Sequence, residues 1–156
     1  SNLSAGNPRT LVRGGCQMSR VYRKARIGTD VERNFVRKLW EKGIPCIRLP
    51  ASGAATGMPR PDILVFLNRE ILCIEMKTSS KEKAVFKKED WEDAYKFSIA
   101  LKKHGFNSTP YLVFHPKGTK KYIWITLTEE AYNKDLRLII RKDKKGWNYF
   151  WSEDGS

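Results

Sequence analysis

Apolar positions along the chain follow two spacings, and the change between them predicts the elements of the fold. From Val31 to Trp40 they recur every three or four residues, which predicts an amphipathic helix that starts at Thr29 and ends at Gly43. Shorter apolar runs bounded by Gly, Pro, Asn and Asp predict strands. The predicted strands are 45–49, 62–67, 71–76, 111–115 and 122–126, with a second helix over 89–103.

This order predicts an α/β fold in which helices flank a central mixed five-stranded sheet. After it, the pattern predicts a short helix over 128–133 and a small added hairpin of strands 136–141 and 147–151. Residues 29–156 are therefore expected to form one domain. Residues 1–28 carry several arginines and no acidic residue, which predicts a flexible basic arm able to lie along phosphates.

Charge narrows the class of partner. Thirty Lys and Arg against 17 Asp and Glu give a net charge of +13 and a pI near 9.8. Such an excess favours a polyanionic partner, most often nucleic acid. Plain solubility and attraction to an anionic membrane are the alternatives.

The cysteines and apolar runs exclude several other classes. Cys16, Cys46 and Cys73 are odd in number and form no Cys-x-x-Cys motif, which argues against a disulfide framework and favours a reducing cytoplasm. The two histidines, His104 and His115, are too few and too far apart to suggest a zinc site with these cysteines. No stretch approaches the ~20 apolar residues of a membrane span, and no signal peptide is expected.

The predicted hairpin 62–76 brings two carboxylates together. If Asn68 and Arg69 form its tip, Asp62 and Glu75 are direct cross-strand partners with Cβ atoms about 4.5–5.5 Å apart. Period-two alternation places Lys77 on the face of Glu75. Like charges directly opposite one another are destabilising, and a cation between them would reverse the sign.

This arrangement points to metal-assisted hydrolysis of a phosphodiester. Two hard oxygen ligands suit Mg²⁺, with Mn²⁺ as a substitute. The alternative is a solvent-exposed edge on which Asp62, Glu75 and Lys77 are surface residues. The two strands are apolar on both faces, however, and buried strands that end in charged groups need a partner for those charges.

Other candidate residues are ambiguous on their own. Thr29 and Glu32 fit a capping box at the start of the first helix, and Glu32 is alternatively a third acidic ligand. Arg33 and Arg48 are either phosphate contacts or simple surface charges. Loop 51–57 is either a connector or a segment that closes over DNA. A run of lysines after the hairpin is either a solvated face or a phosphate-binding surface; it comprises Lys81, Lys83, Lys87 and Lys88.

Taken together, four motifs closely resemble the archaeal Holliday-junction resolvase family. They are Gly28-Thr29-Asp30-Val31-Glu32-Arg33-Asn34, Arg48-Leu49-Pro50-Ala51-Ser52-Gly53, Pro61-Asp62-Ile63 and Ile74-Glu75-Met76-Lys77, with Lys87-Lys88-Glu89 before an aromatic-rich helix. The resemblance covers about residues 20–127. It implies a restriction-endonuclease-like fold and a homodimer that resolves four-way DNA junctions by paired symmetric nicks, in recombination and repair.

The resemblance also implies roles for individual residues. Glu32, Asp62 and Glu75 become acidic metal-site residues and Lys77 the catalytic lysine. Arg33 and Arg48 match basic residues needed for cleavage, and Ser52 matches a loop serine. Neither the basic arm nor the segment after Thr126 matches the family pattern. A nuclease of the same fold acting on flaps, mismatches or duplex sites, and a non-catalytic DNA-binding relative, are the rival hypotheses.

Overall fold

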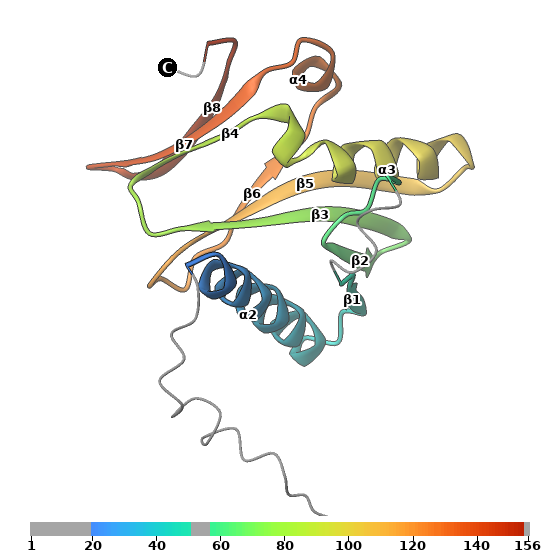
Figure 1. The fold of residues 1–156 in the computed structure, drawn as a ribbon. Coiled ribbons are helices and arrows are strands. Elements are labelled where there is room, and N and C mark those ends of the chain that lie inside the picture. The colour runs from blue at the N-terminus through green and yellow to red at the C-terminus, as the bar shows by residue number, and fades with distance from the viewer. Residues whose placement is uncertain (1–19, 51–56, 155–156) are drawn as a thin grey trace, which may run out of the picture.

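The structure is a computed structural model that describes residues 20–50 and 57–154. Two helices and five strands make up its larger part, and a smaller sheet lies beside them (Figure 1). The elements in chain order are α2 (Arg20–Glu41), β1 (Cys46–Arg48), β2 (Ile63–Leu67), β3 (Glu70–Ser79), β4 (Lys83–Phe86), the 3₁₀ helix η2 (Lys88–Asp90), α3 (Glu92–Lys103), β5 (Asn107–Pro116), β6 (Ile123–Thr126), α4 (Glu129–Asn133), β7 (Arg137–Asp143) and β8 (Gly146–Ser152).

The central sheet has five strands in the order β1-β2-β3-β5-β6. Only β3 and β5 run parallel, and the other neighbours are antiparallel, so the sheet is mixed as the sequence predicts. The crossover from β3 to β5 carries α3, because parallel strands need a long connection. The α/β fold class with this mixed sheet is therefore confirmed.

The β2–β3 hairpin has the predicted tip and register. Asn68 and Arg69 both have positive φ, 52° and 65°, as a two-residue turn that matches the strand twist requires. Leu67 pairs with Glu70, and the ladder continues to Ile63 opposite Ile74. The turn chemistry thus sets which residues of β3 lie beside the start of β2.

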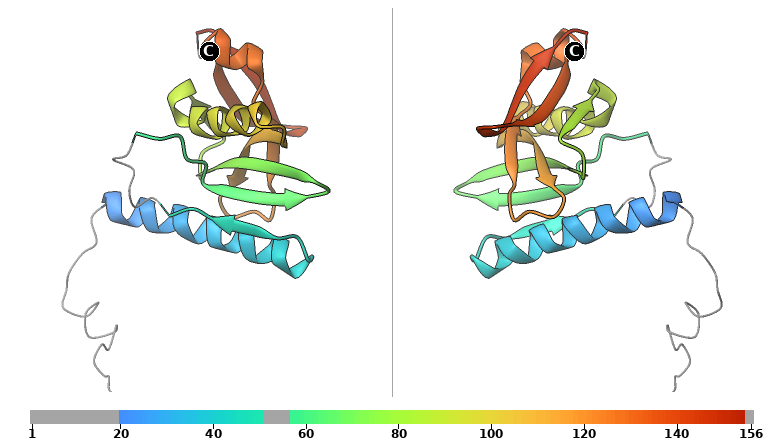
Figure 2. Two further views of the ribbon diagram at one scale, coloured as in Figure 1. Left: turned by 90° about the vertical axis from the view of Figure 1, so that its right-hand side faces the viewer. Right: turned by 90° about the vertical axis from the view of Figure 1, so that its left-hand side faces the viewer.

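Helix α2 covers one face of the sheet and is longer than expected (Figures 1 and 2). Phe35 packs there among buried residues of β2 and β3. The helix begins at Arg20, so Thr29 lies inside it, and the predicted capping box of Thr29 and Glu32 is wrong. Residues 20–28 are rich in Arg, Lys and Ala, which favour helix, and one glycine costs only about 1 kcal/mol.

The same observation shortens the predicted basic arm. Residues 20–28 are helical rather than a flexible arm. Residues 1–19 lie outside the part that the structure describes, so a mobile arm there stays a prediction.

The other face of the central sheet packs against α3 and a second sheet (Figure 2). This sheet has the order β4-β7-β8. The final hairpin is confirmed, but it is not a separate addition, because β7 pairs with β4 in the lysine-rich segment, where the sequence analysis predicts no strand. Buried Leu138 and Ile140 on β7 join the core beneath α3. Pairing between strands about fifty residues apart leaves no local signal in the sequence.

No helix in the described part of the chain is long and apolar enough to cross a membrane.

Candidate active site

Asp62 is held immediately before β2 by contacts on both sides. Its backbone N–H donates to the Ile74 carbonyl at 2.9 Å, and its carbonyl accepts from the Leu49 N–H at 2.8 Å. Its Oδ2 accepts a 2.8 Å hydrogen bond from the Met76 N–H. Two backbone segments, β3 and the residue after β1, therefore fix Asp62, and β3 also holds its carboxyl group.

The predicted cross-strand pairing of Asp62 with Glu75 is wrong in one respect. The ladder ends at Ile63 and Ile74, and Asp62 lies outside β2. The reason is that the Asp62 side chain, rather than a peptide carbonyl, takes the Met76 N–H. The two carboxyl groups nevertheless lie close together: after burial, the charge of Asp62 and a hydrogen bond with it raise the pKa of Glu75.

Glu75 and Lys77 share one face of β3, as alternation predicts. The Lys77 Nζ lies 3.9 Å from the Glu75 Oε2, and the Glu75 side chain is only 13 % exposed. This face is the α3 side of the sheet, where Cys73 is part of the core. An ammonium group therefore stands beside a buried carboxylate at the central strand of the sheet.

Burial dominates the electrostatics of Glu75. It raises the pKa of Glu75 well above the ordinary value, and the charge of Asp62 and the hydrogen bond to it raise this pKa further. Lys77 lowers it and does not offset the other effects. A largely buried carboxyl group next to a second carboxyl group favours a shared proton or a bound cation.

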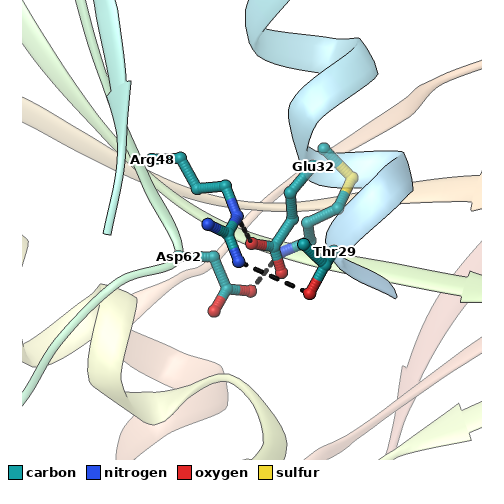
Figure 3. Close-up of polar contacts among 5 residues, drawn as sticks. Thr29, Glu32, Arg48 and Asp62 are labelled. Atoms are coloured by element: carbon teal, nitrogen blue, oxygen red, sulfur yellow. Dashed lines mark hydrogen bonds and ion pairs between the residues drawn. The ribbon is translucent and has the colours of Figure 1, made fainter. Parts of the chain in front are cut away.

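Glu32 reaches from α2 toward Asp62 and Arg48, as Figure 3 shows. The Arg48 Nε donates to the Glu32 Oε1 at 2.8 Å, and the Arg48 Nη2 donates to the Thr29 Oγ1 at 3.4 Å. Burial first, and then the charge of Asp62, raise the pKa of Glu32 to about 7, against the lowering effect of Arg48. The electrostatic effect of Asp62 on Glu32 places the three acids in one neighbourhood.

The predicted set of three metal ligands is only partly assembled. Among the described residues, no group of three or more His, Cys, Asp or Glu side chains is arranged to hold a metal ion. Asp62 and Glu75 form the adjacent pair, and paired hard oxygens are the donors that Mg²⁺ prefers. Glu32 is turned to Arg48, so its role as a third ligand stays a prediction.

The other predicted residues are dispersed. Arg33 is exposed on α2, and Ser52 lies outside the described residues. Lys88 does not point freely into solvent, since its Nζ lies 3.9 Å from the centroid of the Tyr132 ring. The exposed Lys87 uses its backbone N–H to bond the Asp90 carboxylate at 2.9 Å.

Lys81 and Lys83 line a groove of about 690 Å³ at the end of β3. Lys117 from the β5–β6 turn joins them there. The sequence analysis missed Lys117, because between Pro116 and Gly118 it looks like a connector residue. Only the parallel pairing of β3 with β5, which sets Ser79 opposite Pro116, brings this turn to the groove.

The family model described as archaeal Holliday junction resolvase (Hjc) matches residues 23–137. The chain belongs to this family. A curated relative from Sulfurisphaera tokodaii, a crossover junction endodeoxyribonuclease Hjc, is 36 % identical over 72 residues, which are 46 % of this chain and 50 % of the relative. The chain thus spans about half the length of that relative.

A solved structure has the same fold. It is Hjc from Archaeoglobus fulgidus, described as a Holliday junction resolvase, with a TM-score of 0.52 and 19 % identity over 81 % of this chain and 88 % of that one. The family match contains Glu32, Asp62, Glu75 and Lys77 and ends at Arg137, the first residue of β7. The β7–β8 hairpin therefore lies beyond the matched segment.

The raised pKa of Glu32 predicts that the metal-free protein loses stability as pH rises. Between about 4.5 and about 7 the folded protein keeps a proton on Glu32 that the unfolded chain has released, so the free energy of unfolding falls with pH across this window. One such proton changes stability by at most about 1.4 kcal/mol per pH unit.

Urea unfolding of metal-free protein at pH 5 and pH 7.5 measures this slope. Glu32→Gln is expected to flatten it, whereas Glu130→Gln, on a side chain that is 68 % exposed, should leave it unchanged. A slope that is the same in Glu32→Gln and the unmutated protein would contradict the prediction.

Proposed function

We propose that this protein is a metal-dependent, structure-selective endonuclease that resolves four-way DNA junctions by paired symmetric nicks in recombination and repair. The supporting observation is the buried contact of Asp62 and Glu75 beside Lys77, in a chain that belongs to a resolvase family. The names of the two relatives, crossover junction endodeoxyribonuclease and Holliday junction resolvase, support the choice of substrate.

Mg²⁺, with Mn²⁺ as a substitute, is the proposed cofactor, and Asp62 and Glu75 are the proposed ligands. When bound, the ion neutralises charge on the phosphodiester and lowers the pKa of a water molecule. Neutralising the charge of this carboxylate pair removes the repulsion that raises the pKa of Glu75. No small-molecule cofactor is proposed.

Lys77 is proposed to act on the reacting atoms. Its ammonium group, half-buried beside Glu75, can orient the attacking water and stabilise negative charge on the phosphate oxygens. Water attacks phosphorus, the bond to the 3′ oxygen breaks, and that oxygen takes a proton. The products are a 5′-phosphate and a 3′-hydroxyl.

Arg48 is proposed to exchange its ion pair with Glu32 for a contact with a DNA phosphate. In the absence of DNA its guanidinium neutralises Glu32 at 2.8 Å. A backbone phosphate competes for the same planar donors, because guanidinium groups bind phosphate in a forked geometry. Glu32 then becomes available as the third acidic group next to Asp62. Arg33 is proposed to contact DNA, and Ser52, outside the described residues, is proposed as a catalytic loop residue.

A homodimer is the proposed assembly. A four-way junction has approximate two-fold symmetry, and a two-fold dimer presents two equivalent active sites to its opposed strands. Paired cuts at symmetric positions follow from this arrangement.

The decisive experiment compares cleavage of a four-way junction, a flap and a linear duplex of the same sequence, with and without Mg²⁺. Mg²⁺-dependent cutting of the junction at symmetric positions is expected. Equal cutting of all three substrates would favour a less selective nuclease of the same fold. Binding without any cutting would favour the non-catalytic alternative.

A further inference from the structure

The small sheet brings basic residues to the end of the molecule at which β3 finishes. In Figure 1 the β7–β8 turn, the start of β4, the end of β3 and the β5–β6 turn all lie at the left of the molecule. The Lys142 N–H donates to the Glu82 carbonyl at 2.8 Å, which ties β7 to the segment just before β4. Residues far apart in the sequence thus form one surface.

The two faces of the small sheet differ in chemistry. Ala84, Ile140 and Tyr149 pair across the three strands, and Ala84 and Ile140 pack into the core. The neighbouring row alternates to the opposite face and consists of Lys83, Arg141 and Asn148. Most of one face is therefore apolar and packed into the core, although Tyr149 on β8 is exposed. The other face carries the exposed Lys83 and Arg141 at one end, next to the fully buried Ile139.

Lys83 and Arg141 are direct cross-strand partners, and both are exposed. Like charges in this position destabilise a sheet. Among the described residues the structure records no ion pair for either side chain. The nearby Asp143 forms no ion pair with them. Its carboxylate accepts hydrogen bonds from the Asn148 side chain and the Lys145 N–H, each at 2.8 Å. A bound anion would remove this repulsion.

Arg141 is already oriented for such an anion. Its guanidinium lies 5.1 Å from the centroid of the Phe150 ring. Stacking on an aromatic face restricts the guanidinium plane while its N–H groups stay free at the edges. Less side-chain entropy is then lost when a phosphate binds.

The groove of about 690 Å³ connects this face with the catalytic strand. Its lining runs from Thr78 and Ser79, just beyond Lys77, to Lys83 on β4, and none of the described residues that line it is acidic. β4 is an edge strand of its sheet, so the backbone groups on its free side add polar partners along the groove. Lys81 and Lys117 supply two further charges.

We propose that this C-terminal face, formed by Lys83 and Arg141 and reached through the groove, binds the phosphate backbone of a duplex DNA arm outside the catalytic site. The proposal rests on the proposed function and adds a second contact region to it. Duplex is favoured over single-stranded DNA because the aromatic ring on this face, Phe150, is covered by Arg141 and is only half-exposed. Single-strand binding relies on open rings for base stacking.

The test uses the double variant Lys83→Gln/Arg141→Gln in the whole 156-residue chain, with Asp62→Asn added to prevent cleavage during binding. Affinity for a four-way junction is measured from 50 to 300 mM salt. The slope of log Kd against log salt is expected to fall by about 1.8, since each lost phosphate contact removes about 0.9. The Kd at 150 mM salt is expected to rise roughly tenfold.

The matched control removes the same charge elsewhere. Lys103→Gln/Lys134→Gln takes two exposed lysines from α3 and the end of α4 and should leave slope and Kd unchanged. The rescue variant Lys83→Arg/Arg141→Lys keeps the charge and should retain the slope. Junctions with progressively shorter arms provide a second measurement: unmutated protein should lose affinity as the arms shorten, and the double variant should be less sensitive to arm length.

The outcomes separate this proposal from the proposed function. A salt slope and Kd equal to those of the control variant would overturn the proposed contact at Lys83 and Arg141. Junction cleavage by the unmutated protein would still support the proposed function, so the two proposals can fail separately. A variant that loses affinity for single-stranded DNA as strongly as for the junction would overturn the choice of a duplex.

Discussion

Asp62→Asn is expected to reduce the rate of Mg²⁺-dependent junction cleavage about a thousandfold or more while changing junction affinity little. Asparagine keeps an oxygen that can accept the Met76 N–H, so the backbone around the site should stay in place. What is lost is one of the two negative charges proposed to hold the ion, and groups that stabilise charge in the transition state are typically worth a factor of 10²–10³ or more.

Glu75→Gln tests the same pair from the other side. It should also abolish cleavage, and it should raise the stability of the metal-free protein, because it replaces a carboxyl group whose ionisation is disfavoured by burial and by Asp62. Loss of activity together with gained stability is expected of a metal site, because the repulsion between the two carboxyl groups is kept for binding the ion.

Single-turnover cleavage and binding, measured on the same junction, check both variants. Glu130→Gln, on an exposed side chain of α4, is the matched control and should behave as unmutated protein. Normal cleavage rates in Asp62→Asn or Glu75→Gln would show that the reaction takes place elsewhere.

Phe114→Ala is expected to reduce the free energy of unfolding by about 3–5 kcal/mol. Phe114 is fully buried on β5. Its ring centroid lies 6.0 Å from that of Phe86 on β4 and 5.5 Å from that of Trp147 on β8. It therefore packs the central sheet against the small sheet, and its removal leaves a cavity between them.

Phe106→Ala is the matched control for this prediction. The same substitution at a residue that is 54 % exposed should cost less than about 1 kcal/mol. Urea unfolding, followed by far-UV circular dichroism and tryptophan fluorescence, measures both. Two separate transitions in the unmutated protein would show that the small sheet unfolds by itself and would contradict a shared core.

The local parts of the fold could be read from the sequence because their causes are local. Asn68 and Arg69 adopt the positive φ of a two-residue turn, and alternation along the strands then places Glu75 and Lys77 on one face. Apolar runs on both faces predicted that β3 is central, and it is. Excess positive charge predicted a polyanionic partner, in line with the family to which the chain belongs.

The sequence by itself thus determined the strands of the central sheet, the hairpin register and the proximity of Asp62 to Glu75, but not β4 or the start of α2. Only the tertiary structure decided that Glu32 faces Arg48 across 2.8 Å rather than capping a helix, and that Asp62 bonds the Met76 N–H instead of extending the ladder. It also decided that Lys83 meets Arg141 on a second sheet. Turns and side-chain alternation are set by neighbouring residues, whereas these contacts join segments whose approach depends on how the whole core packs.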